Sequence, residues 1–222
     1  LSVGYENIPV QKDISFSVYP GEIVGIIGKN GCGKSTLLKI MAGLEQPDEG
    51  RVEVGETIKI GYLAQEELPI KDSNQRVIDY VKEIGEYVQT RDGRISASQM
   101  LERFLFTPDM QYTPISKLSG GEKRRLYLLS VLVSGANVLI LDEPSNDVDI
   151  PTVTILEDYL NAFSGIVITV SHDRYFLDNV VDRIFEFDGN GTLRQYEGGY
   201  TDYREAKERR FGETGAISSV PG

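Results

Sequence analysis

Gly28-Lys29-Asn30-Gly31-Cys32-Gly33-Lys34-Ser35 is the stretch of sequence that decides the fold. It fits the pattern G-x-x-x-x-G-K-S, and it lies between an apolar run at residues 22–28 and a helical run at residues 34–42. A strand, a glycine-rich loop and a helix in this order form a phosphate-binding loop, because backbone N–H groups and the helix N-terminus surround an anion. The stretch therefore predicts an α/β fold that binds a nucleoside triphosphate.

The residues of this loop have separate expected roles. Lys34 would reach the β- and γ-phosphates, and Ser35 would hold Mg²⁺. The alternative is a glycine-rich turn without a ligand, but every fixed position of the pattern is occupied. We therefore expect the loop to hold ATP through Gly28, Lys29, Asn30, Gly31, Cys32, Gly33, Lys34, Ser35 and Thr36.

Two carboxylates follow a second apolar run. The stretch 137–144 reads as a buried strand that ends in Asp142 and Glu143, before the strand-breaking Pro144. Because consecutive strand residues point to opposite faces, the two carboxylates are expected to have different tasks. Asp142 is predicted to hold Mg²⁺, and Glu143 is predicted to be the base that activates water. The alternative is a pair of solvated acids.

His172 is the only histidine of the chain, and it follows a third apolar run at residues 165–171. A lone histidine is more often structural than catalytic. Ligand sites in open parallel sheets, however, gather at the carboxyl ends of the strands, where Asp142 is also expected. This position favours a catalytic role for His172 near the γ-phosphate.

A second motif reads Leu118-Ser119-Gly120-Gly121-Glu122. Ser119 and Glu122 have the spacing of a capping box at the start of the helical run 123–133, and the glycines leave its N–H groups accessible to an anion. Together with the phosphate loop, this motif resembles the signature of the ABC ATPase superfamily, over residues 1–200.

The resemblance implies a P-loop NTPase fold of the ABC type, with a mostly parallel sheet, an antiparallel β subdomain and a small helical lobe. It also implies a partner, namely a second ABC domain of the same polypeptide or of a homodimer. The two domains would close head to tail around ATP, so an isolated copy is expected to hydrolyse ATP slowly. The residues expected to face the partner's ATP are Ser119, Gly120, Gly121 and Glu122.

Two further site residues follow from the resemblance. Gln65, after a strand expected at residues 58–64, matches the Q-loop and would add a ligand to Mg²⁺. Tyr5 is placed like the aromatic residue that stacks on adenine. A core position for Tyr5 is an equal alternative, because the chain has 12 tyrosines.

Finer matches indicate one branch of the superfamily. Residues 143–149 read E-P-S-N-D-V-D and resemble the E-P-T-N-x-L-D stretch of the ABC-F proteins. Residues 171–177 and 196–203 resemble the same branch, and a hairpin turn predicted at 188–191 makes the second ABC domain of a Uup-type protein the best match. Most ABC-F proteins are ribosome-binding translation factors, so the resemblance implies a ribosomal partner for the full-length protein.

Two other functions remain as alternatives. One is the ATPase motor of a membrane transporter, although the insert at residues 66–118 looks shorter than a transporter's helical lobe. The other is a nucleotide-gated binding module in which hydrolysis is incidental.

Composition limits the partners of this chain. The net charge of −11 opposes binding to a phosphate backbone, so nucleic-acid contact is expected to be weak. The basic cluster 123–125 is interpreted as a solvated helix face, or else as a patch for RNA or a partner domain.

The single cysteine, Cys32, fits a reducing cytosol, which favours a cytoplasmic location. No apolar run reaches the roughly 18–20 residues of a membrane span, so stable membrane association is not expected.

The ATP-binding core is expected to consist of two segments of the chain, with the lobe as an insertion between them. Strands are predicted in residues 1–20, where Ile14, Phe16 and Val18 alternate with polar residues, and at 51–54. The βα alternation of residues 119–187 indicates a parallel sheet. The expected helices are 74–84 and 95–106 in the lobe, 149–161 and 200–210. The expected units are an ATP-binding core with β subdomain at 1–65 and 119–210, a helical lobe at 66–118 and a tail at 211–222.

Overall fold

The computed structural model describes residues 3–5, 8–11, 16–65, 73–90, 93–187 and 192–217, with side chains between residues 16 and 211. A six-stranded sheet forms its centre, in the order β10-β9-β3-β8-β7-β4. Neighbouring strands run parallel, except that β10 is antiparallel to β9. The strands are β3 (Ile23–Gly28), β4 (Ile60–Leu63), β7 (Val138–Asp142), β8 (Ile166–Val170), β9 (Arg183–Phe187) and β10 (Leu193–Glu197).

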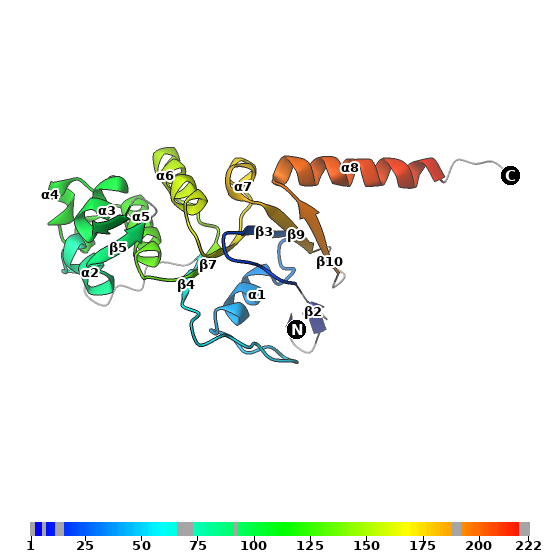
Figure 1. Ribbon diagram of the computed structural model, residues 1–222, viewed down its shortest axis with the longest axis horizontal. Helices are drawn as coiled ribbons and strands as arrows, with labels where there is room; N and C mark the ends of the chain where they lie inside the picture. Colours follow the sequence, from blue (N-terminus) through cyan, green and yellow to red (C-terminus); the bar gives the residue numbers. More distant parts are fainter. Residues whose placement is uncertain are drawn as a thin grey trace.

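Helices cover both faces of this sheet (Figure 1). Helix α1 (Lys34–Met41) lies on one face, and α6 (Ile150–Asn161) and α7 (Arg174–Val180) lie on the other. The residues of β7 alternate between the two apolar cores. Val138 and Ile140 pack with α1, whereas Leu139 and Leu141 pack in the core that contains α6 and α7. Burial on both faces explains why this strand is an uninterrupted apolar run.

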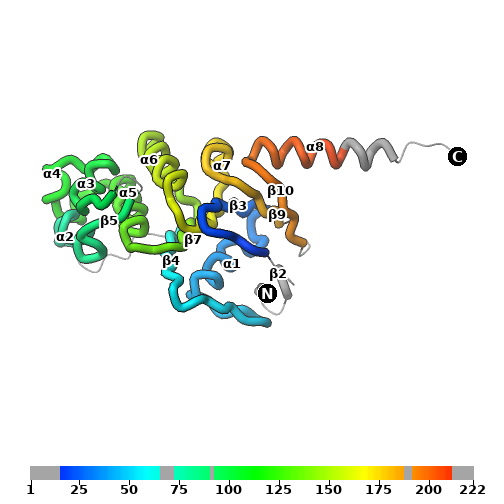
Figure 2. The backbone as a smooth tube through the Cα atoms, viewed as in Figure 1, coloured from blue at the N-terminus to red at the C-terminus, as the bar shows by residue number. Residues whose placement is uncertain are grey.

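The lobe lies at one end of the molecule, and helix α8 (Tyr200–Ile217) projects from the other end (Figures 1 and 2). Helix α5 (Gly120–Leu132) follows the lobe in the chain and leads to β7. The lobe shares one continuous apolar core with the α6 and α7 face of the sheet. Its elements are α2 (Val77–Ile84), β5 (Tyr87–Thr90), β6 (Gly93–Ser96), α3 (Ala97–Arg103), α4 (Pro108–Gln111) and the 3₁₀ turn Ile115–Lys117.

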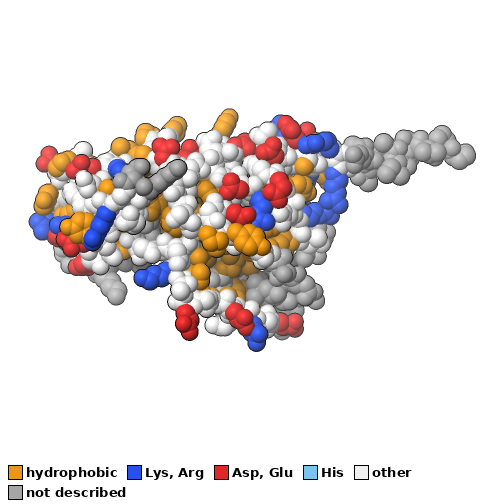
Figure 3. Space-filling model, viewed as in Figure 1, with side chains coloured by type: hydrophobic (Ala, Val, Ile, Leu, Met, Phe, Trp, Pro, Cys, Tyr) orange, Lys and Arg blue, Asp and Glu red, His pale blue; other side chains and the backbone are white. Residues whose placement is uncertain are grey.

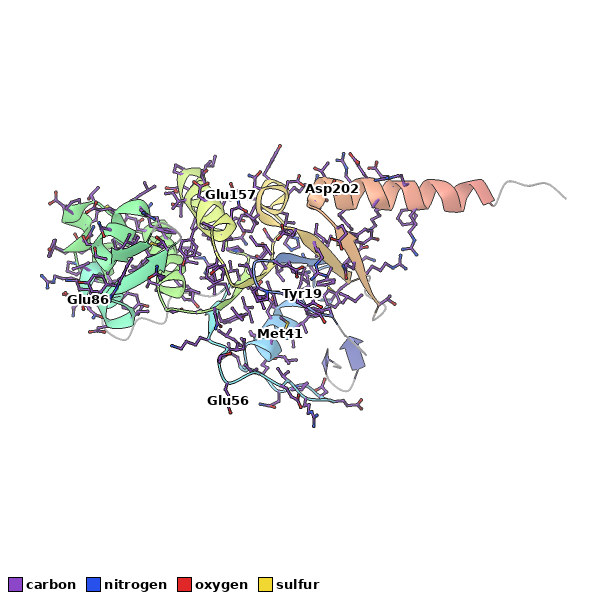
Figure 4. All side chains as sticks on the ribbon, in the orientation of Figure 1. Tyr19, Met41, Glu56, Glu86, Glu157 and Asp202 are labelled. Atoms are coloured by element: carbon purple, nitrogen blue, oxygen red, sulfur yellow. The ribbon has the colours of Figure 1, made fainter. Side chains whose placement is uncertain are left out.

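Figure 4 labels Glu86 in the lobe at one end of the molecule, Asp202 in the first turn of α8, and Glu56 in the long excursion between α1 and β4. A separate antiparallel pair, β1 (Val3–Tyr5) and β2 (Ile8–Gln11), supplies two strands within the first 20 residues, but not at the alternating residues on which that prediction rested. Phe16 and Val18 lie outside any strand, whereas Ile14 and the turn at 188–191 lie outside the described residues.

Three predictions about secondary structure were wrong. Residues 51–54 form no strand, and Val52 and Val54 are 40% and 51% exposed, so their alternation has no core to cover. The lobe includes the antiparallel β5–β6 hairpin as well as helices. Helix α8 continues through Ile217, into the expected tail, because a glycine in a helix costs only about 1 kcal/mol relative to alanine. The division of the chain at residues 66 and 118 stays a prediction.

A buried polar cluster attaches α8 to the sheet. Glu186 of β9 is 8% exposed and accepts hydrogen bonds from Tyr203 Oη at 2.6 Å, from Tyr196 Oη at 3.3 Å and from Lys207 Nζ. Burial alone would raise the pKa of Glu186, but the bonds from Lys207 and Tyr203 outweigh it and lower this pKa. Burial and the neighbouring carboxylate raise the pKa of Tyr203 to about 12. This cluster attaches the first two turns of α8 to β9.

Candidate nucleotide-binding site

The predicted site residues gather at one edge of the central sheet. Because β3, β4, β7 and β8 run parallel, their carboxyl ends lie at the same edge. Gly28 ends β3 and Asp142 ends β7, while His172 and Gln65 lie two residues beyond β8 and β4. This is the edge at which open parallel sheets bind their ligands.

The loop between β3 and α1 has a backbone that depends on glycine. Gly31 and Gly33 have φ angles of 77° and 89°, which side chains with a Cβ rarely adopt. A Cβ on Gly28 would lie 2.9 Å from both the carbonyl oxygen of Phe187 and Sγ of Cys32. The loop is therefore held tightly against β9, and its N–H groups precede the N-terminus of α1, as in a phosphate cradle.

Lys34 lies inside this loop and is only 8% exposed. Its Nζ donates hydrogen bonds to the backbone carbonyls of Gly28, at 2.8 Å, and Lys29, at 2.9 Å. Both carbonyls are neutral, so these two bonds do not cancel the ammonium charge. An anion in the loop would be attracted by this charge and by the first N–H groups of α1.

Asp142 combines deep burial with an unpaired oxygen. It is 2% exposed, and its Oδ1 has no hydrogen-bond partner among the described residues. Burial raises the pKa of Asp142, while the hydroxyl of Ser35 and the charge of Lys34 act in the opposite direction. A carboxylate oxygen beside a serine hydroxyl suits Mg²⁺, which binds few protein oxygens and completes its shell with water and phosphate. The residues present fit this metal.

Glu143 does not occupy the position that strand alternation predicts. It lies beyond the end of β7 and has a φ of 51°, in the left-handed region. A non-glycine residue held there costs about 1–3 kcal/mol, which the surrounding structure must offset. We predicted that Asp142 and Glu143 are consecutive residues of one strand and so point to opposite faces. That prediction was wrong, because Glu143 lies outside the strand. The two carboxylates do have different neighbours, since Asp142 interacts with Ser35 and Lys34 whereas Glu143 contacts His172.

Contacts from β8 and His172 hold Glu143 in this conformation. Its backbone N–H donates to the carbonyl of Val170 at 2.8 Å, and Oε2 accepts from the backbone N–H of His172 at 3.2 Å. Oε1 lies 3.3 Å from Nε2 of His172. Burial raises the pKa of Glu143, while the amide and ring of His172 lower it. The carboxyl is thus disposed to accept a proton, as a general base requires.

The capping box predicted at the start of α5 is confirmed. Oγ of Ser119 accepts from the N–H of Glu122 at 3.2 Å, and Oε2 of Glu122 accepts from the N–H of Ser119 at 2.8 Å. Ser119, Gly120 and Gly121 are exposed. A partner domain could therefore approach this corner, although its role toward a partner's ATP stays a prediction.

The predicted roles of two further site residues, Gln65 and Tyr5, stay untested. Gln65 is exposed after β4, and its role as a metal ligand stays a prediction. Tyr5 ends β1, but its side chain lies outside the described part of the chain.

The basic cluster 123–125 is not simply a solvated face. Arg125 is 9% exposed, lies 3.5 Å from Asp149 and stacks over Phe106. Arg124 donates hydrogen bonds to backbone carbonyls of Ala64 and Glu143. Sequence reasoning missed both arginines, because their partners are distant in the chain and no local pattern reveals them.

This fold and this site define a P-loop ATPase domain of the ABC type. The sequence model of the family described as "ABC transporter" matches residues 11–146, which is more than half of the chain. The chain belongs to this family, and its sequence is that of an ABC-F nucleotide-binding domain.

Several curated relatives support this assignment. YfmR, an ABC transporter ATP-binding protein of Bacillus subtilis (strain 168), is 56% identical over 194 residues, which are 87% of this chain and 31% of that protein. The ATP-binding protein Uup of Escherichia coli (strain K12) is 40% identical over 198 residues, covering 89% and 31%. EttA, the energy-dependent translational throttle protein of Haemophilus influenzae, is 38% identical over 213 residues, covering 96% and 38%. The chain thus spans about a third of the length of these relatives.

Solved structures share the fold. An ATP-binding subunit of an ABC transporter superposes with a TM-score of 0.75 at 20% identity, covering 96% of this chain and 91% of that one. The ATP-binding cassette MJ0796, a dimer bound to ADP and phosphate, gives a TM-score of 0.66 at 22% identity, covering 88% and 94%. None of the helices described here has the length and apolar character needed to cross a bilayer.

Proposed function

We propose that this chain is one half of an ATP-hydrolysing nucleotide sandwich. The observation that carries the proposal is the convergence of Lys34, Asp142 and the Glu143–His172 pair at one sheet edge, while the capped corner of α5 stays exposed. One surface would hold the triphosphate, and the exposed corner would complete the site of a second ABC domain. Hydrolysis by an isolated copy would accordingly be slow.

Glu143 would act as the base in this reaction. The oxygen of a water molecule forms a bond to the γ-phosphorus while the Glu143 carboxylate accepts its proton. The bond between the γ-phosphorus and the bridging oxygen breaks, and ADP leaves with that electron pair. His172, whose side chain is 59% exposed, would donate a hydrogen bond to the γ-phosphate.

Mg²⁺ would be held by Ser35 and Asp142, with Gln65 as a further ligand, and when bound it would neutralise charge on the phosphate oxygens. Tyr5 would stack on adenine. Lys29, Asn30, Cys32 and Thr36 would complete the cradle around the phosphates.

For the full-length protein we propose a cytoplasmic ATPase that acts on the ribosome, with this chain as the second ABC domain of a Uup-type protein. The printed name of EttA ties that relative to translation. Basic and acidic side chains are interspersed among the coloured atoms on the face drawn in Figure 3. With a net charge of −11, this chain would contact nucleic acid only weakly, so ribosomal contacts would come largely from other segments.

Two measurements test the proposal. Calorimetry on this chain should detect ATP binding, and Lys34→Ala should weaken it about 10- to 100-fold, since a hydrogen bond to a charged group is worth about 1.5–3 kcal/mol. Undiminished binding by the variant would contradict the phosphate-loop assignment. Co-sedimentation of the full-length protein with ribosomes and with membrane fractions, in ATP, then separates a ribosomal factor from a transporter motor.

A further inference from the structure

Arg124 connects the ends of two parallel strands. One guanidinium nitrogen donates to the carbonyl of Ala64, just after β4, at 2.8 Å. The other terminal nitrogen donates to the carbonyl of Glu143, just after β7, at 3.3 Å. A guanidinium presents several donors in a rigid plane, which suits two carbonyls on adjacent strands. Helix α5 therefore reaches both strand ends through one side chain.

Tyr127, one turn further along α5, strengthens the connection to β4. Its hydroxyl accepts a hydrogen bond from the N–H of Ala64 at 3.2 Å. The guanidinium of Arg124 lies over the Tyr127 ring, 5.7 Å from its centroid. Both backbone groups of Ala64, the residue before Gln65, are thus bonded to the helix that begins at the Ser119 cap.

Glu143, whose carbonyl accepts the hydrogen bond from Arg124, has a strained backbone. Glu143 has a φ of 51°, and the peptide that joins it to Pro144 has no N–H, so the carbonyl is the only polar group of that peptide. The residue before a proline is also restricted in conformation. This carbonyl accepts from Arg124 and from the N–H of Asn146, at 3.1 Å. Arg124 supplies one of the two bonds that fix the direction of this peptide.

We propose that Arg124 is a positioning residue for hydrolysis. It holds the backbone of Glu143 so that the carboxylate faces His172, and it joins this turn to α5, so that the base and the Ser119 corner move together. The proposal rests on the proposed ATPase function. It predicts that a movement of the exposed residues 119–121 is transmitted to Glu143 of the same chain through the side chain of Arg124.

A charge effect must be separated from the positioning effect. The positive charge of Arg124 also favours the ionised form of Asp142. Arg124→Lys keeps that charge but loses the planar fork, whereas Arg124→Ala removes both. Arg103→Ala is the matched control, because Arg103 is an exposed arginine of the lobe at the end of α3.

The kinetic test measures kcat, KM for ATP and the affinity for ADP in the full chain. Arg124→Ala should lower kcat about 10²-fold, the scale of a misplaced catalytic group, with KM and ADP affinity unchanged. Arg124→Lys should recover only part of this loss, and added guanidinium ion should raise the rate of the alanine variant. Arg103→Ala should match the wild type. A wild-type kcat in Arg124→Ala, or full activity in Arg124→Lys, would overturn the proposal.

Backbone amide exchange tests the same connection without turnover. In Arg124→Ala, the amides of Ala64 and Asn146 should exchange faster, while those of β3 and α6 should keep wild-type rates. Unchanged exchange at both positions overturns the proposal, whatever the kinetics show. If the wild type hydrolyses no ATP, the proposed function fails separately, and the exchange result alone decides whether Arg124 orders the Glu143 turn.

Discussion

Glu143 contacts His172 through both carboxylate oxygens, one at the backbone and one at the ring. Oε2 accepts from the backbone N–H of His172 at 3.2 Å, and Oε1 lies 3.3 Å from Nε2 of its ring. The turn after β7 and the turn after β8 are therefore fixed to each other through the two residues proposed to act on the γ-phosphate. We therefore expect a substitution at either residue to shift the other.

Glu143→Gln should separate nucleotide binding from hydrolysis. The amide keeps the size of the side chain but cannot accept the proton of water, so kcat should fall about 10²–10⁴-fold while ATP affinity is retained. Burial raises the pKa of Glu143. The apparent pKa read from the acid limb of the wild-type pH–rate profile should therefore lie above the ordinary glutamate pKa of about 4.3. Steady-state turnover across pH, together with calorimetry, checks both expectations.

An unchanged kcat in this variant would remove Glu143 from its role as base. Glu157→Gln provides the control, since Glu157 lies on α6 and bonds only to Asn179 among the contacts described. That variant should keep both the rate and the acid limb of the wild type.

Asp142→Asn should stabilise the nucleotide-free protein. A carboxyl whose pKa is raised on folding destabilises the folded state once it ionises, and burial raises the pKa of Asp142. This destabilisation is fully present above the folded-state pKa and absent below the unfolded-state value. The variant should therefore have a higher Tm at pH 7, by about 2–4 °C for each kcal/mol gained, and the difference should shrink on acidification.

Thermal unfolding at several pH values measures this difference. Addition of Mg²⁺ and ATP should raise the Tm of the wild type more than that of Asp142→Asn. An equal rise in both proteins would argue against a metal at this carboxylate.

Substitutions at Gly120 should move stability and turnover in opposite directions. A Cβ on Gly120 meets no heavy atom within 4 Å, and alanine is favoured over glycine in a helix by about 0.5–1 kcal/mol. Gly120→Asp also places an acid at a helix N-terminus, which stabilises the free chain. It would, however, repel the γ-phosphate of a partner domain, so turnover should fall further than in Gly120→Ala. Urea unfolding and ATPase assays at several protein concentrations compare the two variants.

Lys207→Met should loosen α8 from the sheet. Removing the ammonium group leaves Glu186 without its cationic partner, so the free energy of unfolding should fall by about 1–2 kcal/mol at pH 7. The Lys207 side chain is 38% exposed, and solvent screening keeps the effect near the lower value. Because the pKa of Glu186 is lowered on folding, this stabilisation is present above the unfolded-state pKa and is lost as pH falls through the folded-state value.

Urea unfolding near pH 7 and in acid checks this sign. Arg204→Met is the control on the same helix, because among the described residues Arg204 pairs with the exposed Glu208 and should contribute about 0.5 kcal/mol or less. Equal losses in the two variants would show that the Glu186 cluster adds nothing beyond a surface pair.

Elements with local signals could be predicted from the sequence. The helix expected at 149–161 is α6 (Ile150–Asn161), with Asp149 as its N-cap and Pro151 in its first turn. The strand–loop–helix arrangement at residues 23–41 and the Ser119 capping box were also predicted correctly, since neighbouring residues determine each of them. The β5–β6 hairpin gave no such signal, because its strands have four residues each and only Val88 is buried among Tyr87 to Thr90.

The site was harder to predict wherever its contacts cross the fold. Arg124 bonds to residues 60 and 19 positions away, and no pattern along α5 shows where its guanidinium lies. The left-handed turn at Glu143 depends on Val170 and His172, which only the parallel register of β7 and β8 brings close.

The close approach of Gly28 to Phe187 makes the nucleotide site dependent on a strand near the far end of the described chain. Every residue of the G-x-x-x-x-G-K-S pattern could be retained while the shape of the loop is lost, if β9 is shifted or removed. Designers who shorten this domain should therefore keep the β9–β10 hairpin together with the loop, and screens for loss of ATP binding should recover substitutions around Phe187.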